Sequence, residues 1–170
     1  MVELLLDQGA DVDRVSEWWK AGFHLDDIPV EVSERLIAEG AVVNVHTLAG
    51  LGLVERLRAV LESDPALVCV EGGDGCTPLH FARDIATAQV LLEHEADINA
   101  RDEDHRSTPA QWRIKEAPEV TRFLIAQGAE ADIFMAAGLG DVDLTQRLID
   151  EDPECTTYRI GNNSGPFPGI

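Results

Sequence analysis

Cys76, His80 and Asp74 bring together the residue types of a nucleophilic site. They supply a thiol, an imidazole and a carboxylate within seven consecutive residues, the groups that cysteine hydrolases combine. Closeness in sequence says little about geometry, because Cys76 falls on a predicted loop tip and His80 in the helix that follows it. We therefore expect no catalytic site at these residues.

A second segment, ARDEDHRST at 100–108, holds residue types that bind metal ions. Asp102, Asp104 and His105 could each supply one ligand atom. The segment lacks the glycine and the final glutamate of a calcium loop, and no second cluster of His or Cys completes a zinc site. We expect a solvated loop tip, and keep an enzyme or metal-binding protein with a site near 102–112 as an alternative.

Other motifs of catalysis or cofactor binding are missing from the sequence. There is no GxSxG, Walker loop or GxGxxG pattern, and AGLG at 49–52 and 137–140 is expected to end helices rather than cradle a phosphate. Cys69, Cys76 and Cys155 form no CxxC pair and are odd in number, which predicts free thiols. We predict no enzyme, no cofactor and no structural metal.

The composition predicts a helical, strongly acidic protein. Of the 170 residues, 45% are hydrophobic but only 5% are aromatic, which favours thin, closely stacked helices. The net charge of −19, spread along the whole chain, would repel nucleic acid and attract a basic partner, and such a surface is also typical of soluble bacterial proteins. No apolar stretch approaches the roughly 18 residues of a membrane helix, so we expect a cytoplasmic protein.

Internal repeats organise the chain. AEGAVVNVHTLAGLG at 38–52 matches AQGAEADIFMAAGLG at 126–140, an offset of 88 residues that predicts two copies of one unit. Within the copies a shorter period appears, because a turn of the GA type recurs after 31 residues in the first copy and after 33 in the second. These turns fall at Gly9, Gly40, Glu95 and Gly128.

Each period contains an amphipathic helix, and a glycine ends it at all of these positions except Glu95. In VTRFLIAQ at 120–127, Phe123 and Leu124 lie on one apolar stripe. Gly40 and Gly128 then stand where a left-handed helix cap is favoured. A short helix at residues 2–8 is predicted to end in the same way.

The segment TPLHFA at 77–82, and its relative STPAQW at 107–112, mark the start of a second kind of helix. Thr77 can cap this helix and Pro78 is tolerated at its first position. Small alanines let such helices stack closely. We expect an inner helix at 78–83, paired with the amphipathic helix that follows it.

TPLHFA followed by VLLEHEADIN resembles the ankyrin repeat, and the resemblance extends over nearly all of residues 2–168. The pattern is divergent and is weakest at 14–28. The resemblance implies an all-α solenoid of about five helix-pair repeats, forming a single domain over 1–170. Because the chain opens on an outer helix and stops at GPFPGI, which aligns with GCTPLH, we expect incomplete terminal repeats and a fragment of a longer protein.

The resemblance further implies β-hairpin fingers around 66–77 and 97–108. Only six residues link the glycine to the next inner helix at 40–46 and 128–134, too few for a finger. These two junctions are therefore predicted to lack one. The repeat with TPLHFA is also short, which requires the chain to turn quickly near Asp84.

The resemblance assigns His46 and His80 a structural role, bonding neighbouring loops and securing the stack. Gln111 replaces this histidine in the next repeat, so that junction must be held in another way. Phe81 and Trp112 fall on equivalent positions. We expect core packing for them, with an aromatic ladder that receives a partner side chain as the alternative.

The family's usual activity, protein recognition, is the function the resemblance implies. The predicted contact residues are Gly73, Asp74, Cys76, Asp104, His105 and Ser107 at the fingertips, and Leu51, Asp84, Lys115, Glu116 and Leu139 at the inner-helix ends. The acidic members of this set favour a basic partner. The other hypothesis is a structural segment of a longer repeat protein, which would self-associate through its incomplete ends.

Overall fold

The computed structural model describes residues 7–9, 30–103 and 105–158. The predicted helix at 2–8 and the divergent segment at 14–28 fall almost wholly outside these ranges. Within them the structure is helical, and none of their residues belongs to a β-strand. None of the helices described there is long and apolar enough to cross a membrane.

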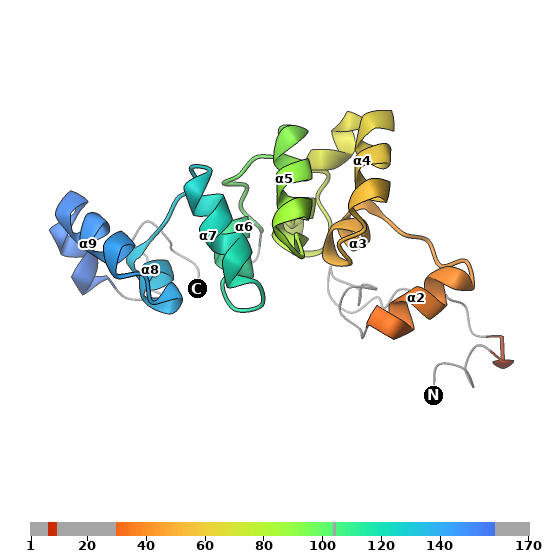
Figure 1. Ribbon diagram of the computed structural model, residues 1–170, viewed down its shortest axis with the longest axis horizontal. Helices are drawn as coiled ribbons and strands as arrows, with labels where there is room; N and C mark the ends of the chain where they lie inside the picture. Colours follow the sequence, from red (N-terminus) through yellow and green to blue (C-terminus); the bar gives the residue numbers. More distant parts are fainter. Residues whose placement is uncertain (1–6, 10–29, 104, 159–170) are drawn as a thin grey trace.

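The helices come in pairs that follow one another along the longest axis of the molecule (Figure 1). The pairs are α3 (Val45–Gly50) with α4 (Val54–Ser63), η4 (Pro78–Phe81) with α5 (Ile85–Glu93), α6 (Pro109–Arg113) with α7 (Pro118–Ala126), and α8 (Ile133–Leu139) with α9 (Val142–Glu151). The remaining elements are α2 (Val30–Ala38) and the 3₁₀ helices η2 (Pro65–Cys69), η3 (Gly73–Gly75) and η5 (Pro153–Thr157).

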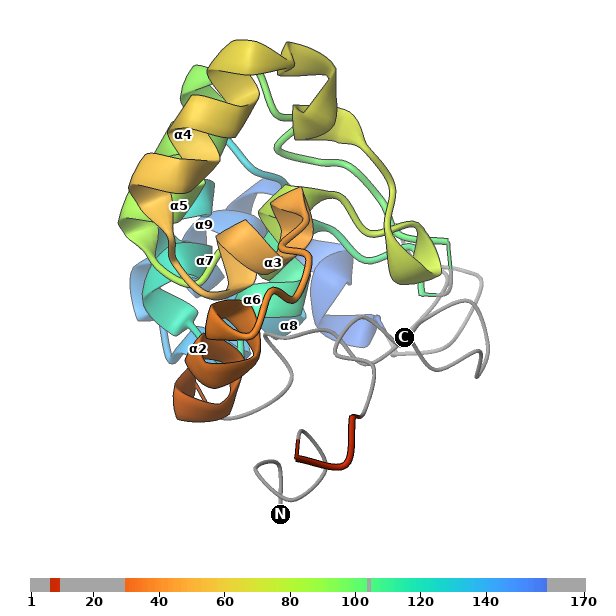
Figure 2. The ribbon, with the colours of Figure 1, turned by 90° about the vertical axis from the view of Figure 1, so that its right-hand side faces the viewer.

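Two helical layers result from the stacking of the pairs. Helices α3, η4 and α6 contact in turn to form the inner layer, and α4, α5 and α7 contact in turn to form the outer layer. Viewed along the stack, α4 and α5 lie on one side and α3, α6 and α8 on the other (Figure 2). This arrangement is the all-α solenoid that the resemblance implies.

The elements recur at the offset found in the sequence. Helix α7 begins 88 residues after α2, α9 begins 88 residues after α4, and η5 begins 88 residues after η2. Asp64 and Asp152 cap the two 3₁₀ helices in the same way, each accepting the backbone N–H two residues further on, at 3.2 and 3.0 Å. The repeated sequence therefore folds alike in both places.

Residues in the left-handed backbone conformation end the outer helices, as predicted. Gly40 has a φ of 99° and Gly128 a φ of 100°, values that a residue without a Cβ adopts at low cost. At the equivalent position Glu95 takes a φ of 66° despite its side chain. After the two glycines the chain runs directly to the inner-helix caps Asn44 and Asp132, so these junctions carry no finger, also as predicted.

The expected inner helix at 78–83 is shorter than predicted and is a single 3₁₀ turn, η4. Thr77 and His80 cap it reciprocally. Ala82 then leaves helical geometry, with φ −51° and ψ 112°, and Asp84 caps α5 at once. The shortness of this repeat explains the difference, because there is too little chain for a full α-helix before α5 begins.

The predicted hairpins are tight turns without strands. We call residues 72–76 the first finger turn and residues 102–107 the second, of which residue 104 is not described. One backbone hydrogen bond closes each turn, at 2.8 and 3.1 Å, and a third bond of 2.6 Å from Glu103 N–H to the Asp74 carbonyl joins the two turns. A single closing bond makes no ladder, so the β-hairpin prediction was wrong in this detail.

Leucines and alanines form a continuous core between the layers. The fully buried leucines described are Leu48, Leu57, Leu61, Leu79, Leu91 and Leu124, and the fully buried alanines of the inner segments are Ala49, Ala82, Ala110 and Ala136. Each buried leucine contributes about 1.5–3 kcal/mol of transfer free energy. The alanines allow the inner segments to approach closely.

Candidate functional site

Cys76, His80 and Asp102 lie together beneath the finger turns. Their ligand atoms are within 4.8 Å of one another, and all three side chains are fully buried. The sequence analysis placed Asp74 beside Cys76, but the second finger turn packs on the first and supplies Asp102 instead. In the part of the chain that the structure describes, this is the one cluster of at least three potential metal ligands.

Asp102 is occupied by donors from its own turn and from α6. Its carboxylate accepts the backbone N–H of His105 at 2.7 Å and of Ser107 at 3.2 Å, and the indole N–H of Trp112 at 2.5 Å. The prediction of a solvated tip was therefore wrong for Asp102. The fold tolerates this buried carboxylate because three N–H groups stabilise it. Through the same bonds Asp102 organises the second finger turn.

Both ring nitrogens of His80 are also engaged. Nδ1 accepts the backbone N–H of Thr77 at 3.0 Å, which leaves the proton on Nε2, where it donates to the Ser107 carbonyl at 3.2 Å. Burial lowers the pKa of His80 from 6.5, opposed in part by the hydrogen bond to the Ser107 carbonyl and by the charge of Asp102. His80 is thus a neutral ring that joins η4 to the next finger turn.

Cys76 is a protonated, unreactive thiol in this setting. Burial raises its pKa to about 12, and the negative charges of Asp102 and Asp74 add to the effect. The thiolate is the form that attacks carbon or binds a metal, and it is scarce at neutral pH with such a pKa. Since His80 and Asp102 are already bonded, the cluster secures the stack rather than offering a reactive group.

Phe81 and Trp112, which we call the aromatic pair, lie side by side on neighbouring inner segments. Their ring centroids are 6.0 Å apart with the planes tilted by 48°. Phe81 packs on the hydrophobic core, and both side chains keep part of their surface exposed. The two interpretations of these residues are therefore compatible, because each ring makes packing contacts and keeps part of its surface exposed.

Histidines of the preceding repeats support both rings. His46 meets Phe81 edge to face at 5.6 Å, and His80 meets Trp112 in the same way at 6.1 Å. The Nε2 of His46 also lies 3.2 Å from the carbonyl oxygen of Cys76 in the first finger turn. The predicted role of His46 and His80 in securing the stack is confirmed.

Gln111 takes over the role of the histidine in the next repeat. Its carbonyl oxygen accepts the backbone N–H of Thr108 at 2.9 Å, and its amide donates to Asp132 at 3.0 Å. An amide offers one acceptor and one donor at its tip, as a neutral imidazole does. The prediction that this junction is held in another way was therefore wrong. The shared position of Gln111 and His80 was the signal in the sequence that pointed to the same role.

The structure places the predicted contact residues in three groups. Exposed are His105, Lys115 and Glu116; partly exposed are Gly73, Asp74, Leu51 and Asp84; buried are Cys76, Ser107 and Leu139. Asp104 lies outside the described residues. A buried side chain has almost no surface to offer, so Cys76, Ser107 and Leu139 are removed from the candidate site.

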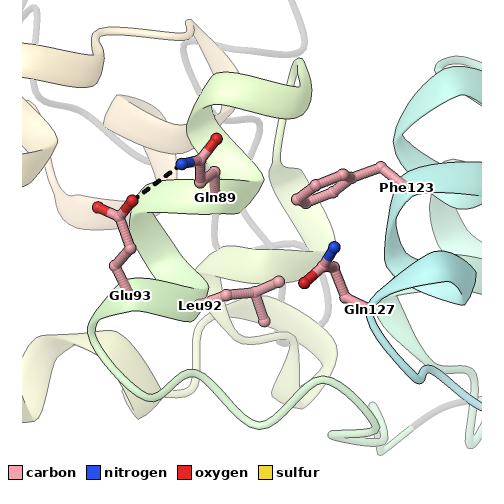
Figure 3. A pocket seen from close by; sticks show the side chains of 5 residues that line it. All are labelled: Gln89, Leu92, Glu93, Phe123 and Gln127. Carbon is pink, nitrogen blue, oxygen red and sulfur yellow. Dashed lines mark hydrogen bonds between the residues drawn. The ribbon is translucent and has the colours of Figure 1, made fainter.

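An open cavity of about 430 Å³ lies in the outer layer between α5 and α7. Gln89, Leu92 and Glu93 line one side of it, and Phe123 and Gln127 line the other (Figure 3). The Glu93 carboxylate is bonded to Gln89 at 3.0 Å and to Arg58 at 2.9 Å. Two of its polar lining side chains, Gln89 and Glu93, are therefore already paired with each other.

The comparisons with known proteins agree with this architecture. Residues 74–103 match the family model for the ankyrin repeat. Over 108 residues the chain is 31% identical to "Ankyrin repeat and SAM domain-containing protein 6" of Rattus norvegicus, and 30% identical to the protein of that name from Mus musculus. Each match covers 61% of this chain but only 12% of the relative. Together with the stacked helix pairs, these matches show that the chain contains an ankyrin repeat at residues 74–103 and is similar to ankyrin-repeat proteins.

Proposed function

We propose that this chain is a recognition module that holds a partner protein on its inner face. By inner face we mean the exposed side of the inner layer around the aromatic pair, bordered by the two finger turns. Ankyrin repeats are in general modules for protein interaction. The identity of the site within this chain is our proposal.

The observation that carries the proposal is the rigid, partly exposed aromatic pair. Trp112 is fixed by the edge of His80 and by the buried carboxylate of Asp102. Phe81 is fixed by His46 and by the core. Large aromatic side chains that are already ordered lose little entropy on binding, and Trp in particular is common among residues that dominate binding energy.

The electrostatics support a partner with a basic surface. The chain carries 32 acidic and 13 basic residues, and its field accelerates the encounter with positively charged proteins. The reactive groups that an enzyme would need are buried, paired or protonated in the Cys76 cluster. We therefore propose binding without catalysis.

A second candidate is a stacking segment within a longer repeat array. The observation that favours it is the comparison with the rat and mouse proteins, of which the chain matches 12%. In that case the ends of this chain would contact further repeats, and isolated chains would associate through them. The two candidates are separated by the solution mass and by the experiment that follows.

The test compares Trp112→Ala with Phe123→Ala. Both substitutions remove a partly buried aromatic side chain, but Trp112 lies on the inner face and Phe123 in the outer cavity. A partner captured with the wild-type chain is purified, and its affinity for each variant is measured by calorimetry. We expect Trp112→Ala to weaken binding by at least tenfold, about 1.4 kcal/mol, and Phe123→Ala to leave it unchanged.

Circular dichroism and urea unfolding show whether each variant is folded. Equal binding by a folded Trp112→Ala variant would remove the inner face from the proposal. Equal losses of affinity in both variants would mean that the loss results from destabilisation of the fold and not from removal of a contact made by the aromatic pair.

A further inference from the structure

The inner face has two edges of opposite charge. We call the two finger turns with the adjoining Glu71 the finger edge, and the C-terminal ends of η4 and α6 with the residues just after them the helix-end edge. Charged side chains with exposed surface at the finger edge are Glu71, Asp74, Glu103 and Arg106. Those at the helix-end edge are Arg83, Arg113, Lys115, Asp84 and Glu116.

The finger edge is acidic. Of the four charged side chains described there with exposed surface, three are carboxylates, and the bond from Glu103 N–H to the Asp74 carbonyl joins the turns that carry two of them. Arg101 does not offset this charge, because it pairs with Glu130 at 2.6 Å on the neighbouring repeat. The two carboxylates therefore lie on adjoining turns, and the second of these turns is bonded to Trp112 through Asp102.

The helix-end edge is basic. Arg83 is exposed. Its side chain packs against Gly52, just after α3, because a Cβ atom added to Gly52 would lie only 3.1 Å from the Arg83 Cδ. Lys115 follows α6 and is exposed. The acids at this edge are Asp84 and Glu116, and the Asp84 carboxylate is held back on α5 by bonds from the N–H and hydroxyl of Thr87, both at 2.8 Å. Against them stand Arg83, Arg113 and Lys115, so the edge has an excess of positive charge in a molecule whose net charge is −19.

We infer that the partner presents a segment of mixed charge that crosses the aromatic pair, with a lysine or arginine at the finger edge and a carboxylate at the helix-end edge. This inference rests on the proposed function. A cation that lies between the carboxylates of the finger edge and the faces of Trp112 and Phe81 is attracted by both. At the helix-end edge, a carboxylate of the segment is attracted by Arg83 and Lys115, whereas a uniformly basic segment would be repelled there by like charges.

The charge pattern gives specificity that the net charge does not. Attraction to a protein of charge −19 favours any basic surface at long range. The two edges act at contact distance, where juxtaposed like charges are costly, and so they select the order of charges along the segment. A single-stranded nucleic acid could stack on the aromatic pair, but its phosphates would meet the acidic finger edge.

Three labelled peptides of equal length test the inference. Each has a central leucine pair, flanked by lysines on both sides, by lysines and glutamates on opposite sides, or by glutamates on both sides. Fluorescence anisotropy with the intact chain gives their affinities. We expect the mixed peptide to bind the wild-type chain most tightly, by about five- to tenfold over the other two.

Charge reversals at the edges then change the preference. With Glu103→Lys the finger edge becomes neutral, so the mixed peptide should lose its advantage over the all-acidic peptide, and with Lys115→Glu the all-basic peptide should bind best. The control reversals Glu62→Lys and Arg147→Glu lie on exposed positions of α4 and α9, the second helices of their pairs, and should leave the order of the three peptides unchanged.

Two results would overturn the inference while leaving the proposed function standing. One is tightest binding of the all-basic peptide to the wild-type chain with no effect of Lys115→Glu. The other is binding of none of the three peptides while Trp112→Ala still weakens the captured partner. Tight binding of an oligothymidine that depends on Trp112 would instead assign the face to nucleic acid and overturn both.

Discussion

The buried carboxylate of Asp102 accepts the indole N–H of Trp112 at 2.5 Å, and this bond joins the second finger turn to the inner face. The same carboxylate holds the turn together through two backbone N–H groups. A change in the finger turn is therefore transmitted to the orientation of the Trp112 ring. Asp102 positions Trp112 without having surface of its own.

Replacing Asp102 with alanine should destabilise the chain and loosen Trp112. Three N–H groups lose their acceptor, and we expect a loss of about 2–4 kcal/mol in the free energy of unfolding. Asp102→Asn keeps one acceptor oxygen and should cost less. Urea unfolding measures the loss, with the exposed neighbour Glu103→Ala as the control. A cost of Asp102→Ala no larger than that of the control would show that the carboxylate does not organise the turn.

Much of the helical framework could be predicted from the sequence, because repeat spacing and helix caps are local properties. Gly40 and Gly128 adopt the left-handed conformation that their positions require, and Asp84 begins α5 where the short repeat demands it. The offset of 88 residues reappears in the bounds of the outer helices. Patterns of this kind depend on residues within one or two turns of each other.

The candidate site could be predicted only in part, because its key contacts join residues of different repeats. Asp102 has a sequence context that suits an exposed tip, and it is buried only because the second finger turn packs on the first. Gln111 replaces a histidine with a residue of another class, so its shared position with His80 is a weak signal, and its two bonds establish the equivalence. Local sequence does not decide which way a polar turn residue points.

The stability of the chain should depend on pH through His80. The pKa of His80 is lowered by burial in the folded state, so protons bind more readily to the unfolded chain. The contribution of neutral His80 to the free energy of unfolding is therefore fully present at pH values above 6.5, the ordinary pKa of histidine. It is lost as the pH falls through and below that value. Urea unfolding at pH 7.5 and at pH 5.0 measures the change.

His80→Gln is the control for this dependence, since Gln111 shows that an amide can make the same two kinds of bond. Carboxylates contribute equally to both proteins, so the difference between them reports on His80. We expect the wild-type chain to lose more stability than the variant between the two pH values. Parallel losses would mean that His80 does not resist protonation in the fold.

The cysteines should differ strongly in reactivity. Cys69 is exposed, whereas Cys76 is fully buried and its pKa is raised to about 12. With a thiol reagent at pH 8, we expect Cys69 to react rapidly and Cys76 to react only when the chain unfolds. Mass spectrometry of the wild-type chain and of Cys69→Ser identifies the labelled residue. Rapid labelling of Cys76 in the folded chain would revive the nucleophilic interpretation of the Cys76 cluster.

Exchanging residues at two equivalent helix ends should shift stability in opposite directions. Glu95 has a φ of 66°, where its side chain is strained, while Gly128 has a φ of 100° with no atom within 4 Å of a Cβ placed there. Glu95→Gly relieves strain and should stabilise the chain by about 0.5–1 kcal/mol. Gly128→Ala introduces strain without a clash and should destabilise it by about 1–2 kcal/mol. Thermal and urea unfolding measure both, and a destabilising Glu95→Gly would mean that contacts of the Glu95 side chain outweigh the cost of its backbone conformation.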